Sequence, residues 1–202
     1  MDGNGFAGTL PTEIGAMSNL QFFSVRNNAL TGTLPTSIGQ MTMLQHLVVD
    51  GNRFSGALPT ELGQLTRVET LFMYDNQFNG TLPTELGNLT AVTGLSLRMN
   101  DFTGTIPTEL GLMTTCQQLW AHTNNFNGSI PTEIFAMTDL TVLSLYNNSL
   151  TGTLPSQLGA LAFLETISVE GNDLVGTLPT EMGQLTALTY LDVQTNSFTG
   201  TF

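Results

Sequence analysis

The chain has 202 residues with 16 acidic side chains, four arginines and no lysine, and its formal net charge is -12. That sign disfavours binding to nucleic-acid phosphates and to anionic lipid surfaces, both of which attract clustered Lys and Arg side chains. An apolar fraction of 41% supports a continuous core and excludes intrinsic disorder. No apolar run approaches the ~20 residues of a membrane helix, and residues 1–4 lack the basic and apolar regions of a signal peptide.

A repeat of 24 residues runs through the whole chain without insertion or deletion. All eight prolines keep this spacing: Pro11, Pro35, Pro59, Pro83, Pro107, Pro131, Pro155 and Pro179. Nine asparagines do the same: Asn4, Asn28, Asn52, Asn76, Asn100, Asn124, Asn148, Asn172 and Asn196. Because nothing interrupts the repeat, we expect residues 1–202 to form a single solenoid domain without internal boundaries.

Each complete unit begins with a short, half-buried strand in which apolar and variable residues alternate. The first apolar residues of these strands are Leu20, Leu44, Val68, Val92, Cys116, Leu140, Leu164 and Leu188. A turn at the repeated asparagine follows, and then a segment related to Thr-Gly-Thr. The unit closes with a single helical turn that proline is expected to start from the first helical position, as in Pro179 to Leu185.

Neighbouring coils are predicted to stack, with their strands aligned in a parallel sheet, because one coil cannot bury its apolar face alone. The repeated asparagine is expected to point inward as a ladder, since its carboxamide can pair the free backbone groups of a tight turn. The column two residues later is expected to form a core spine. It contains Phe54, Phe78, Phe102, Phe126, Phe198, Leu30, Leu150 and Leu174.

These residues follow the pattern LxxLxLxxNxLxGxIPxxLGxL, which resembles the plant-type leucine-rich repeat over the whole chain. The resemblance implies an α/β solenoid, a right-handed curved superhelix of about eight 24-residue coils with a parallel concave β-sheet and a second short sheet. Receptor ectodomains and polygalacturonase-inhibitor-like proteins are similar, and such relatives typically act outside the cell as recognition surfaces. The cysteine-paired terminal caps usual in these relatives have no counterpart here, where Cys116 is the only cysteine.

Both ends of the sequence fall inside a repeat, so we expect a fragment of a longer protein that lacks its terminal caps. Self-association at such uncapped ends is a further expectation. Four N-glycosylation sequons begin at Asn79, Asn88, Asn127 and Asn147 and are compatible with a secretory route. Together with the resemblance, they predict an extracellular or cell-surface location.

Strand alternation sends the third, fifth and seventh residues of each strand segment outward, onto the expected concave face. All three tyrosines, the only tryptophan and both histidines fall in these columns. Exposed aromatic and Arg side chains dominate interface hot spots, so the sequence predicts a binding site for a protein, peptide or glycan ligand. The centre of this site is formed by Phe72, Tyr74, Arg98, Trp120, His122 and Tyr146.

Phe72 and Trp120 stand two coils apart in this site, with Gly94 and Ser96 between them. The spacing predicts a shallow slot about 9.6 Å wide for an aliphatic chain or a sugar ring. Arg98 is expected to pair with a ligand carboxylate. Related receptors often hold such a carboxylate with two arginines one residue apart, and the matching pair here is Ser96 and Arg98. The alternative is that the aromatics serve only packing between neighbouring strands.

Other residues argue against catalysis and against a cofactor or metal. Cys116 takes the place of an apolar strand residue, which indicates a buried small hydrophobe. His46 and His122 lie three coils apart, too far to share a metal ion. A column of glutamates two residues after proline suits the first helical turn electrostatically. No Ser/His/Asp arrangement has the support that catalysis requires, so we expect a non-catalytic protein without a cofactor.

Threonine is in excess, with 32 residues. Two threonine-rich columns flank the glycine of the Thr-Gly-Thr segment, and they resemble the hydroxyl and methyl lattices of ice-binding solenoids. Ice or surface binding is the second hypothesis, with sensitivity expected at Thr105 and Thr153. Asn79, Asn127 and Val175 interrupt one column, and threonine also suits strands for packing reasons alone. A structural scaffold or spacer within a larger assembly is the third hypothesis.

Overall fold

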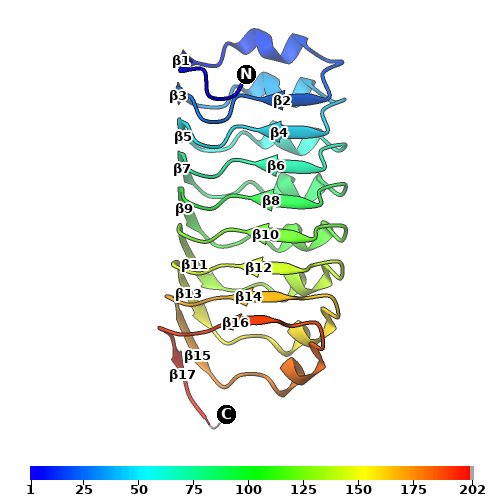
Figure 1. Ribbon diagram of the computed structural model, residues 1–202, viewed down its shortest axis with the longest axis vertical. Helices are drawn as coiled ribbons and strands as arrows, with labels where there is room; N and C mark the ends of the chain where they lie inside the picture. The colour runs from blue at the N-terminus through cyan, green and yellow to red at the C-terminus, as the bar shows by residue number, and fades with distance from the viewer. Residues whose placement is uncertain (201–202) are drawn as a thin grey trace.

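The computed structural model describes residues 1–200, which form a stack of similar coils (Figure 1). Each complete coil contributes one strand to a main sheet, one strand to a second sheet and one short helical turn. In Figure 1 the main sheet faces the viewer, the second sheet lies along the left edge, and the helical turns lie behind and to the right. The predicted solenoid of stacked 24-residue coils is confirmed.

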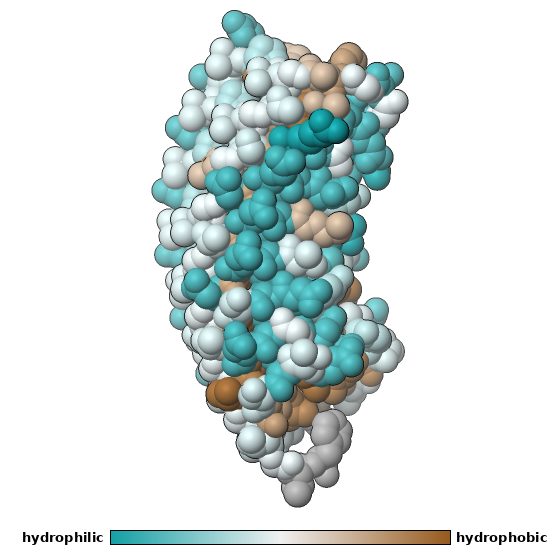
Figure 2. Space-filling view, turned by 90° about the vertical axis from the view of Figure 1, so that its left-hand side faces the viewer, coloured by the Kyte–Doolittle hydropathy of each residue, from teal (hydrophilic) through white to brown (hydrophobic). Residues whose placement is uncertain are grey.

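The main sheet is parallel, and its strands pair so that residues 24 positions apart become neighbours; Ser96, for example, pairs with Phe72 on one side and Trp120 on the other. Its outward side is hollowed along its length, at the right of Figure 2, and is called the concave face below. The strands are β2 (Phe22–Ser24), β4 (His46–Val48), β6 (Thr70–Phe72), β8 (Gly94–Ser96), β10 (Gln118–Trp120), β12 (Val142–Ser144), β14 (Thr166–Ser168) and β16 (Tyr190–Asp192).

The second sheet is also parallel and follows the turn at the repeated asparagine. Its existence near the Thr-Gly-Thr segment agrees with the expectation from the family resemblance. The strands are β1 (Ala7–Thr9), β3 (Ala29–Gly32), β5 (Arg53–Gly56), β7 (Gln77–Gly80), β9 (Asp101–Gly104), β11 (Asn125–Ser129), β13 (Ser149–Gly152), β15 (Asp173–Gly176) and β17 (Ser197–Phe198).

The helical turns are short 3-10 helices, and they differ from the expectation in one respect. Proline precedes the first helical residue: Pro179 has extended backbone angles (φ -67, ψ 137), and its carbonyl accepts a bond from Met182 N–H at 3.1 Å. The fixed φ of proline suits this extended position as well as a helical one. The turns are η1 (Thr12–Ala16), η2 (Thr36–Gln40), η3 (Thr60–Gln64), η4 (Thr84–Asn88), η5 (Thr108–Leu112), η6 (Thr132–Ala136), η7 (Ser156–Ala160) and η8 (Thr180–Gln184).

A continuous core of leucine, isoleucine, valine, methionine and phenylalanine fills the space between the two sheets and the helical turns. Its phenylalanine spine is a stack of parallel rings. Phe102 is fully buried and lies between Phe78 and Phe126, with ring centroids 6.2 and 6.1 Å apart. Stacked rings of this kind bury a large apolar area and add an aromatic contact between successive coils.

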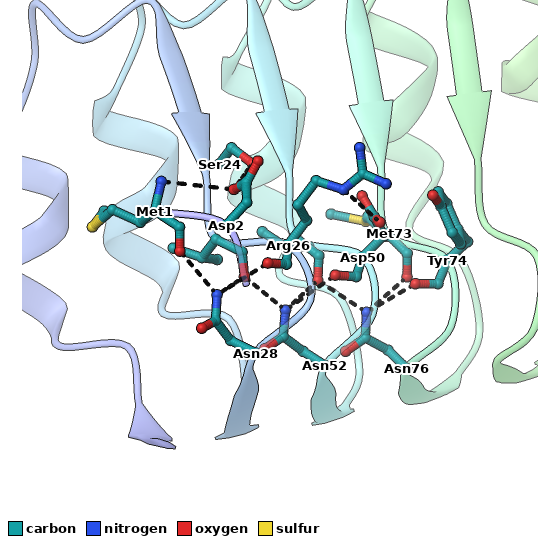
Figure 3. Close-up of polar contacts among 12 residues, drawn as sticks. Met1, Asp2, Ser24, Arg26, Asn28, Asp50, Asn52, Met73, Tyr74 and Asn76 are labelled. Atoms are coloured by element: carbon teal, nitrogen blue, oxygen red, sulfur yellow. Dashed lines mark hydrogen bonds and ion pairs between the residues drawn. The ribbon is translucent and has the colours of Figure 1, made fainter. Parts of the chain in front are cut away.

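The repeated asparagine forms the predicted inward ladder. Asn52 donates from Nδ2 to the carbonyl oxygens of Val25 and Val49, at 3.0 and 3.1 Å. Its Oδ1 accepts a bond from Leu30 N–H, in the preceding coil, at 3.1 Å. Figure 3 shows the same orientation for the carboxamides of Asn28 and Asn76. Each carboxamide therefore satisfies backbone groups of its own coil and of the one before it.

The last described coil buries its apolar residues less completely than the inner coils. A hollow of about 1000 Å³ opens there, lined by Leu188, Leu191, Val193 and Phe198 among others. The hydrophobic colour near the lower end of Figure 2 marks the same region. The apolar side chains of this coil thus remain accessible, whereas those of the inner coils are covered by a neighbour on each side.

Candidate ligand-binding face

Six side chains predicted as the binding site lie on the concave face and form two contacting groups, one of four side chains and one of two. We call Phe72, Tyr74, Arg98, Trp120, His122 and Tyr146 together the platform. Phe72 and Trp120 come from β6 and β10, and the other four from the turns that follow four successive main strands. The fifth column of the strand segments thus holds two members and the seventh column holds four.

The slot expected between Phe72 and Trp120 is absent. The two rings meet edge to face across the intervening coil, with centroids 6.2 Å apart and planes at 73°. Gly94 leaves room for this contact, because a Cβ built there would lie 3.3 Å from the Phe72 ring. Ser96 is only 2% exposed, and its Oγ has no hydrogen bond. The aromatic pair therefore makes a closed surface.

Arg98 lies over the ring of Tyr74, with its guanidinium carbon 4.2 Å from the ring centroid. This is a cation–π contact, and it holds the guanidinium in a fixed position. Tyr74 in turn contacts Phe72, with centroids 6.3 Å apart. The Arg98 Nε is buried and has no hydrogen-bond partner among the described residues. Arg98 is therefore held by packing and retains the ability to donate hydrogen bonds.

His122 stacks on Tyr146, with ring centroids 4.0 Å apart and planes 10° from parallel. The imidazole is only 6% exposed, and Nδ1 lies 3.2 Å from the hydroxyl of Thr123. Burial, assisted by the positive charge of Arg98, lowers the pKa of His122 to about 4. The ring is therefore neutral near pH 7 and acts as part of a stacked aromatic surface.

One further residue of the concave face, Asp50, is not among the predicted site residues. Asp50 stands in the same outward column as Tyr74 and Arg98, yet it is only 1% exposed. Neither carboxylate oxygen has a hydrogen bond of ordinary length and angle, and the nearest cation is Arg26, whose Nε lies 3.6 Å from Oδ2. Burial raises the pKa of Asp50, whereas the nearby Tyr74 hydroxyl, as a donor, and the charge of Arg26 act to lower it. An acidic residue in this column was the available signal, but its burial depends on how the flanking side chains pack.

The other chemically active residues of the chain take structural positions. Cys116 is buried, its thiol contacts the carbonyl of Gln118 at 3.4 Å, and burial raises its pKa to about 12. A thiol with that pKa is a poor nucleophile near neutral pH. His46 packs on Phe22, with ring centroids 5.6 Å apart. Within residues 1–200, no group of three His, Cys, Asp or Glu side chains is arranged to hold a metal ion.

One threonine-rich column lies in the strands of the second sheet, and the other directly follows these strands, where a contact between coils holds its side chains. Gly104 has a φ of +74, and a Cβ built there would lie 2.7 Å from Cγ2 of Thr81 in the preceding coil. The threonine methyl thus occupies the space above the glycine. Thr105 and Thr153 make the equivalent contacts with the next glycines, and both are exposed. Methyl packing restricts the χ1 rotamers of these β-branched side chains, although Ala57 and Ser129 replace threonine at two positions of the column.

The four sequon asparagines are exposed. Asn79 and Asn127 lie in β7 and β11 of the second sheet, and Asn88 ends η4. Asn147 follows Tyr146 directly and adopts a φ of +51. Three sequons therefore lie away from the concave face, while the fourth borders the platform.

Two family models match parts of the sequence. A model described as "Leucine-rich repeat region" matches residues 4–101, and a model described as "Leucine Rich Repeat" matches residues 139–161. The chain belongs to the leucine-rich-repeat family. No curated protein matches its sequence significantly.

Solved leucine-rich-repeat structures share the fold closely. The ectodomain of the Arabidopsis thaliana receptor kinase GASSHO1/SCHENGEN3, in complex with CASPARIAN STRIP INTEGRITY FACTOR 2, is 34% identical with a TM-score of 0.94; the match covers 95% of this chain and 23% of that one. The Arabidopsis receptor kinase HAESA, in complex with the peptide hormone IDA and the co-receptor SERK1, is 31% identical with a TM-score of 0.94, covering 98% of this chain and 33% of that one.

A third similar structure is a plant ice-binding protein, which is 26% identical with a TM-score of 0.82; the match covers 95% of this chain and 62% of that one. The chain thus spans about a quarter to a third of the two receptor chains and under two thirds of the ice-binding one. Among residues 1–200, no helix has the length and apolar character needed to cross a lipid bilayer.

Proposed function

We propose that this leucine-rich-repeat chain is a non-catalytic recognition module that binds a protein or peptide ligand through the platform on its concave face. The observation that carries the proposal is the fixed geometry of the platform: Arg98 packs on Tyr74 at 4.2 Å, and His122 packs on Tyr146 at 4.0 Å. Side chains that are ordered before binding lose little conformational entropy when a ligand arrives.

The chemistry of the platform suits a polypeptide. Phe72 and Trp120 offer a closed apolar surface, which an apolar ligand side chain can cover without entering a pocket. Beside them, Arg98 supplies a guanidinium that can hydrogen-bond a carboxylate or a backbone carbonyl. This combination of aromatic and arginine side chains is typical of interface hot spots. The peptide-hormone receptor among the similar structures supports a ligand of the same class.

The experiment is affinity capture from an extracellular extract with three forms of the chain. The wild type is compared with a Phe72→Ala/Arg98→Ala/Trp120→Ala variant and with a matched Arg53→Ala/Gln77→Ala/Asn125→Ala control on the second sheet. Circular dichroism first establishes that all three are folded. We expect wild type and control to retain the same partner and the platform variant to lose it. Equal retention by all three chains, or by none, contradicts the proposal.

Enzymatic treatment of the extract then identifies the partner class. Prior protease digestion should abolish capture if the ligand is a protein, and a short peptide should be recovered and sequenced by mass spectrometry. A partner that survives proteolysis and disappears after glycosidase treatment would instead be a glycan, which also packs well on aromatic rings. That result would overturn the ligand class while retaining the site.

Ice binding is a second candidate function, favoured by the threonine-rich column that follows the strands of the second sheet and by the similar ice-binding structure. The test is microscopy of ice crystals growing in the protein solution. Thr105→Arg and Thr153→Arg should then abolish any crystal shaping, whereas Thr42→Arg, at an exposed position outside the column, should not. Crystals that grow as in buffer with the wild-type chain exclude this function.

An extracellular or cell-surface location belongs to the same proposal, and the exposed sequons support it. Expression through a secretory pathway, followed by peptide mapping, should show glycans at one or more of Asn79, Asn88, Asn127 and Asn147. A fully unglycosylated product would contradict the use of these sites. Self-association through the open final coil is tested separately by sedimentation, where a concentration-independent monomer would exclude it.

A further inference from the structure

Asp50 is a buried carboxylate on the concave face, and its oxygen atoms have no hydrogen-bond donors at ordinary distances and angles. It is only 1% exposed. Buried carboxylates ordinarily have several donors, because the loss of hydration is costly. The groups around Asp50 are few: Arg26 in the preceding coil, Asp2 at longer range, and the Tyr74 hydroxyl in the following coil, which lies close enough to lower the pKa of Asp50 as a donor but outside ordinary hydrogen-bond geometry. Free Asp50 therefore has unused capacity to accept hydrogen bonds.

Arg26 occupies this position only loosely. Its Nε lies 3.6 Å from Asp50 Oδ2, which satisfies an ion pair but not a hydrogen bond, and its side chain is 44% exposed. Figure 3 shows the Arg26 side chain reaching over Asp50 from the neighbouring coil. An arginine with this exposure can rotate into solvent, where hydration of its guanidinium offsets part of the loss of the ion pair. The same rotation would uncover the carboxylate.

We propose that the Asp50 carboxylate binds a cationic group of the ligand, a guanidinium or an ammonium, and that Arg26 occupies this position in the free protein. We call this position the Asp50 site. The proposal rests on the proposed function, since it assumes that the ligand lies along the concave face. It specifies that the part of the ligand bound at Asp50 carries a positive charge. The net charge of -12 favours the approach of such a cation.

The position of the Asp50 site also restricts the spacing between the charged groups of the ligand. Asp50 and Arg98 belong to the same column and flank Tyr74, so their strands are about 9.6 Å apart. An extended peptide spans that distance with about three residues. The structure therefore points to a peptide segment that places a Lys or Arg side chain, or an amino terminus, about three residues from an acceptor group bound by Arg98.

The test uses Nα-acetyl-L-arginine amide as the cationic probe and the matching citrulline amide as its neutral control. Binding is measured by NMR titration for Arg26→Ala, in which the competing side chain is removed, and for Arg26→Ala/Asp50→Asn. We expect the arginine probe to bind Arg26→Ala at least tenfold more tightly than the double variant, because a charge-assisted hydrogen bond is lost. Citrulline amide should bind neither. Equal affinity of the two variants for the arginine probe overturns the proposal.

A stability measurement separates a binding role from a structural one. Asp50→Asn alone should raise the melting temperature or leave it unchanged, because it removes a buried charge without hydrogen bonds while keeping the shape. Asp75→Asn, an exposed acid of the neighbouring coil, is the control for general charge effects. A clear fall in melting temperature for Asp50→Asn, without one for Asp75→Asn, would show that the Arg26 ion pair is structural and would contradict the proposal.

Failure of this inference is distinguishable from failure of the proposed function. In one outcome the platform variant loses its partner, but the arginine probe binds Arg26→Ala and Arg26→Ala/Asp50→Asn equally. The proposed function is then supported and the Asp50 site is wrong. In the other outcome the probe binds Arg26→Ala more tightly than the double variant, but the platform variant still captures the partner. Asp50 is then an independent cation site and the platform is not the ligand-binding site.

Discussion

The imidazole of His122 and the phenol of Tyr146 lie in adjacent coils as a parallel stack, with centroids 4.0 Å apart. Burial in this stack, together with the charge of Arg98, lowers the pKa of His122 to about 4, so the imidazole is neutral near pH 7. In the unfolded chain the same imidazole has its ordinary pKa of 6.5. The two values differ, so this one contact makes stability depend on pH.

We expect the free energy of unfolding to fall as pH decreases from 6.5 to 4, with a His122 contribution of about 2 to 3 kcal/mol. Between these values the unfolded state binds a proton that the folded state does not. Urea denaturation at pH 7 and pH 4.5 measures the loss. Carboxylates also titrate in this range, so His122→Phe is the reference, and its smaller loss isolates the histidine. Equal losses in both proteins would refute the assignment.

Thr123 follows His122 in a left-handed backbone conformation, with a φ of +57. A β-branched residue is strained there, whereas Gly51 and Gly171 occupy the same position in other coils at a φ of +65. Thr123→Gly should therefore stabilise the chain by about 0.5 to 1 kcal/mol, measured by chemical denaturation. Thr105→Gly, at an exposed position outside the left-handed region, should destabilise it. A lower stability for Thr123→Gly than for wild type would contradict the strain argument.

Asn100 is expected to be among the least replaceable residues. Its Nδ2 donates to the carbonyls of Met73 and Leu97 at 3.1 and 3.0 Å, and its Oδ1 accepts from Phe78 N–H at 3.1 Å. Asn100→Leu leaves these buried groups unpaired and should cost about 3 kcal/mol or more. Asn125→Leu, on the exposed side of β11, is the control and should change stability by under about 0.5 kcal/mol. Similar losses for both variants would exclude a ladder function.

Two glycines test the contact between coils on the second sheet. Gly104 and Gly80 share a positive φ, but an added Cβ meets Thr81 Cγ2 at 2.7 Å in the first case and Ala57 Cβ at 3.5 Å in the second. Gly104→Ala should therefore cost about 1 to 3 kcal/mol more than Gly80→Ala. Removing the methyl in a Gly104→Ala/Thr81→Ala double variant should recover most of that difference. Additive effects of the two changes would show that the methyl contact is not the cause.

The fold follows from the sequence because its main determinants repeat in one column each. Asn52 and Phe102 could be assigned to the interior from their spacing alone, since every coil presents an equivalent residue to the same neighbours. The start of the helical turn was wrong by one position, because proline at Pro179 is compatible with both an extended and a helical backbone. That ambiguity is local, and it leaves the stack unchanged.

Column spacing predicted which side chains share the concave face, but not how they pack against one another. Column spacing placed Phe72 and Trp120 two coils apart, which suggested an open slot, but large flexible rings close such a gap by leaning over Gly94. The burial of Asp50 has the same origin, since it depends on the rotamers chosen by Arg26 and Tyr74. Sequence periodicity determines where the backbone of each residue lies in the stack, whereas contacts with neighbouring side chains determine its rotamer.

The uniform 24-residue period has a consequence for how this face can change. Ladder bonds join residues 22 or 27 positions apart, so the loss of one whole period, such as residues 77–100, would recreate equivalent bonds at the junction. The same loss would place Tyr74 directly beside His122. Duplication or deletion of units therefore offers a route to new ligand specificities in which the recognised surface is reordered while the backbone scaffold is inherited intact.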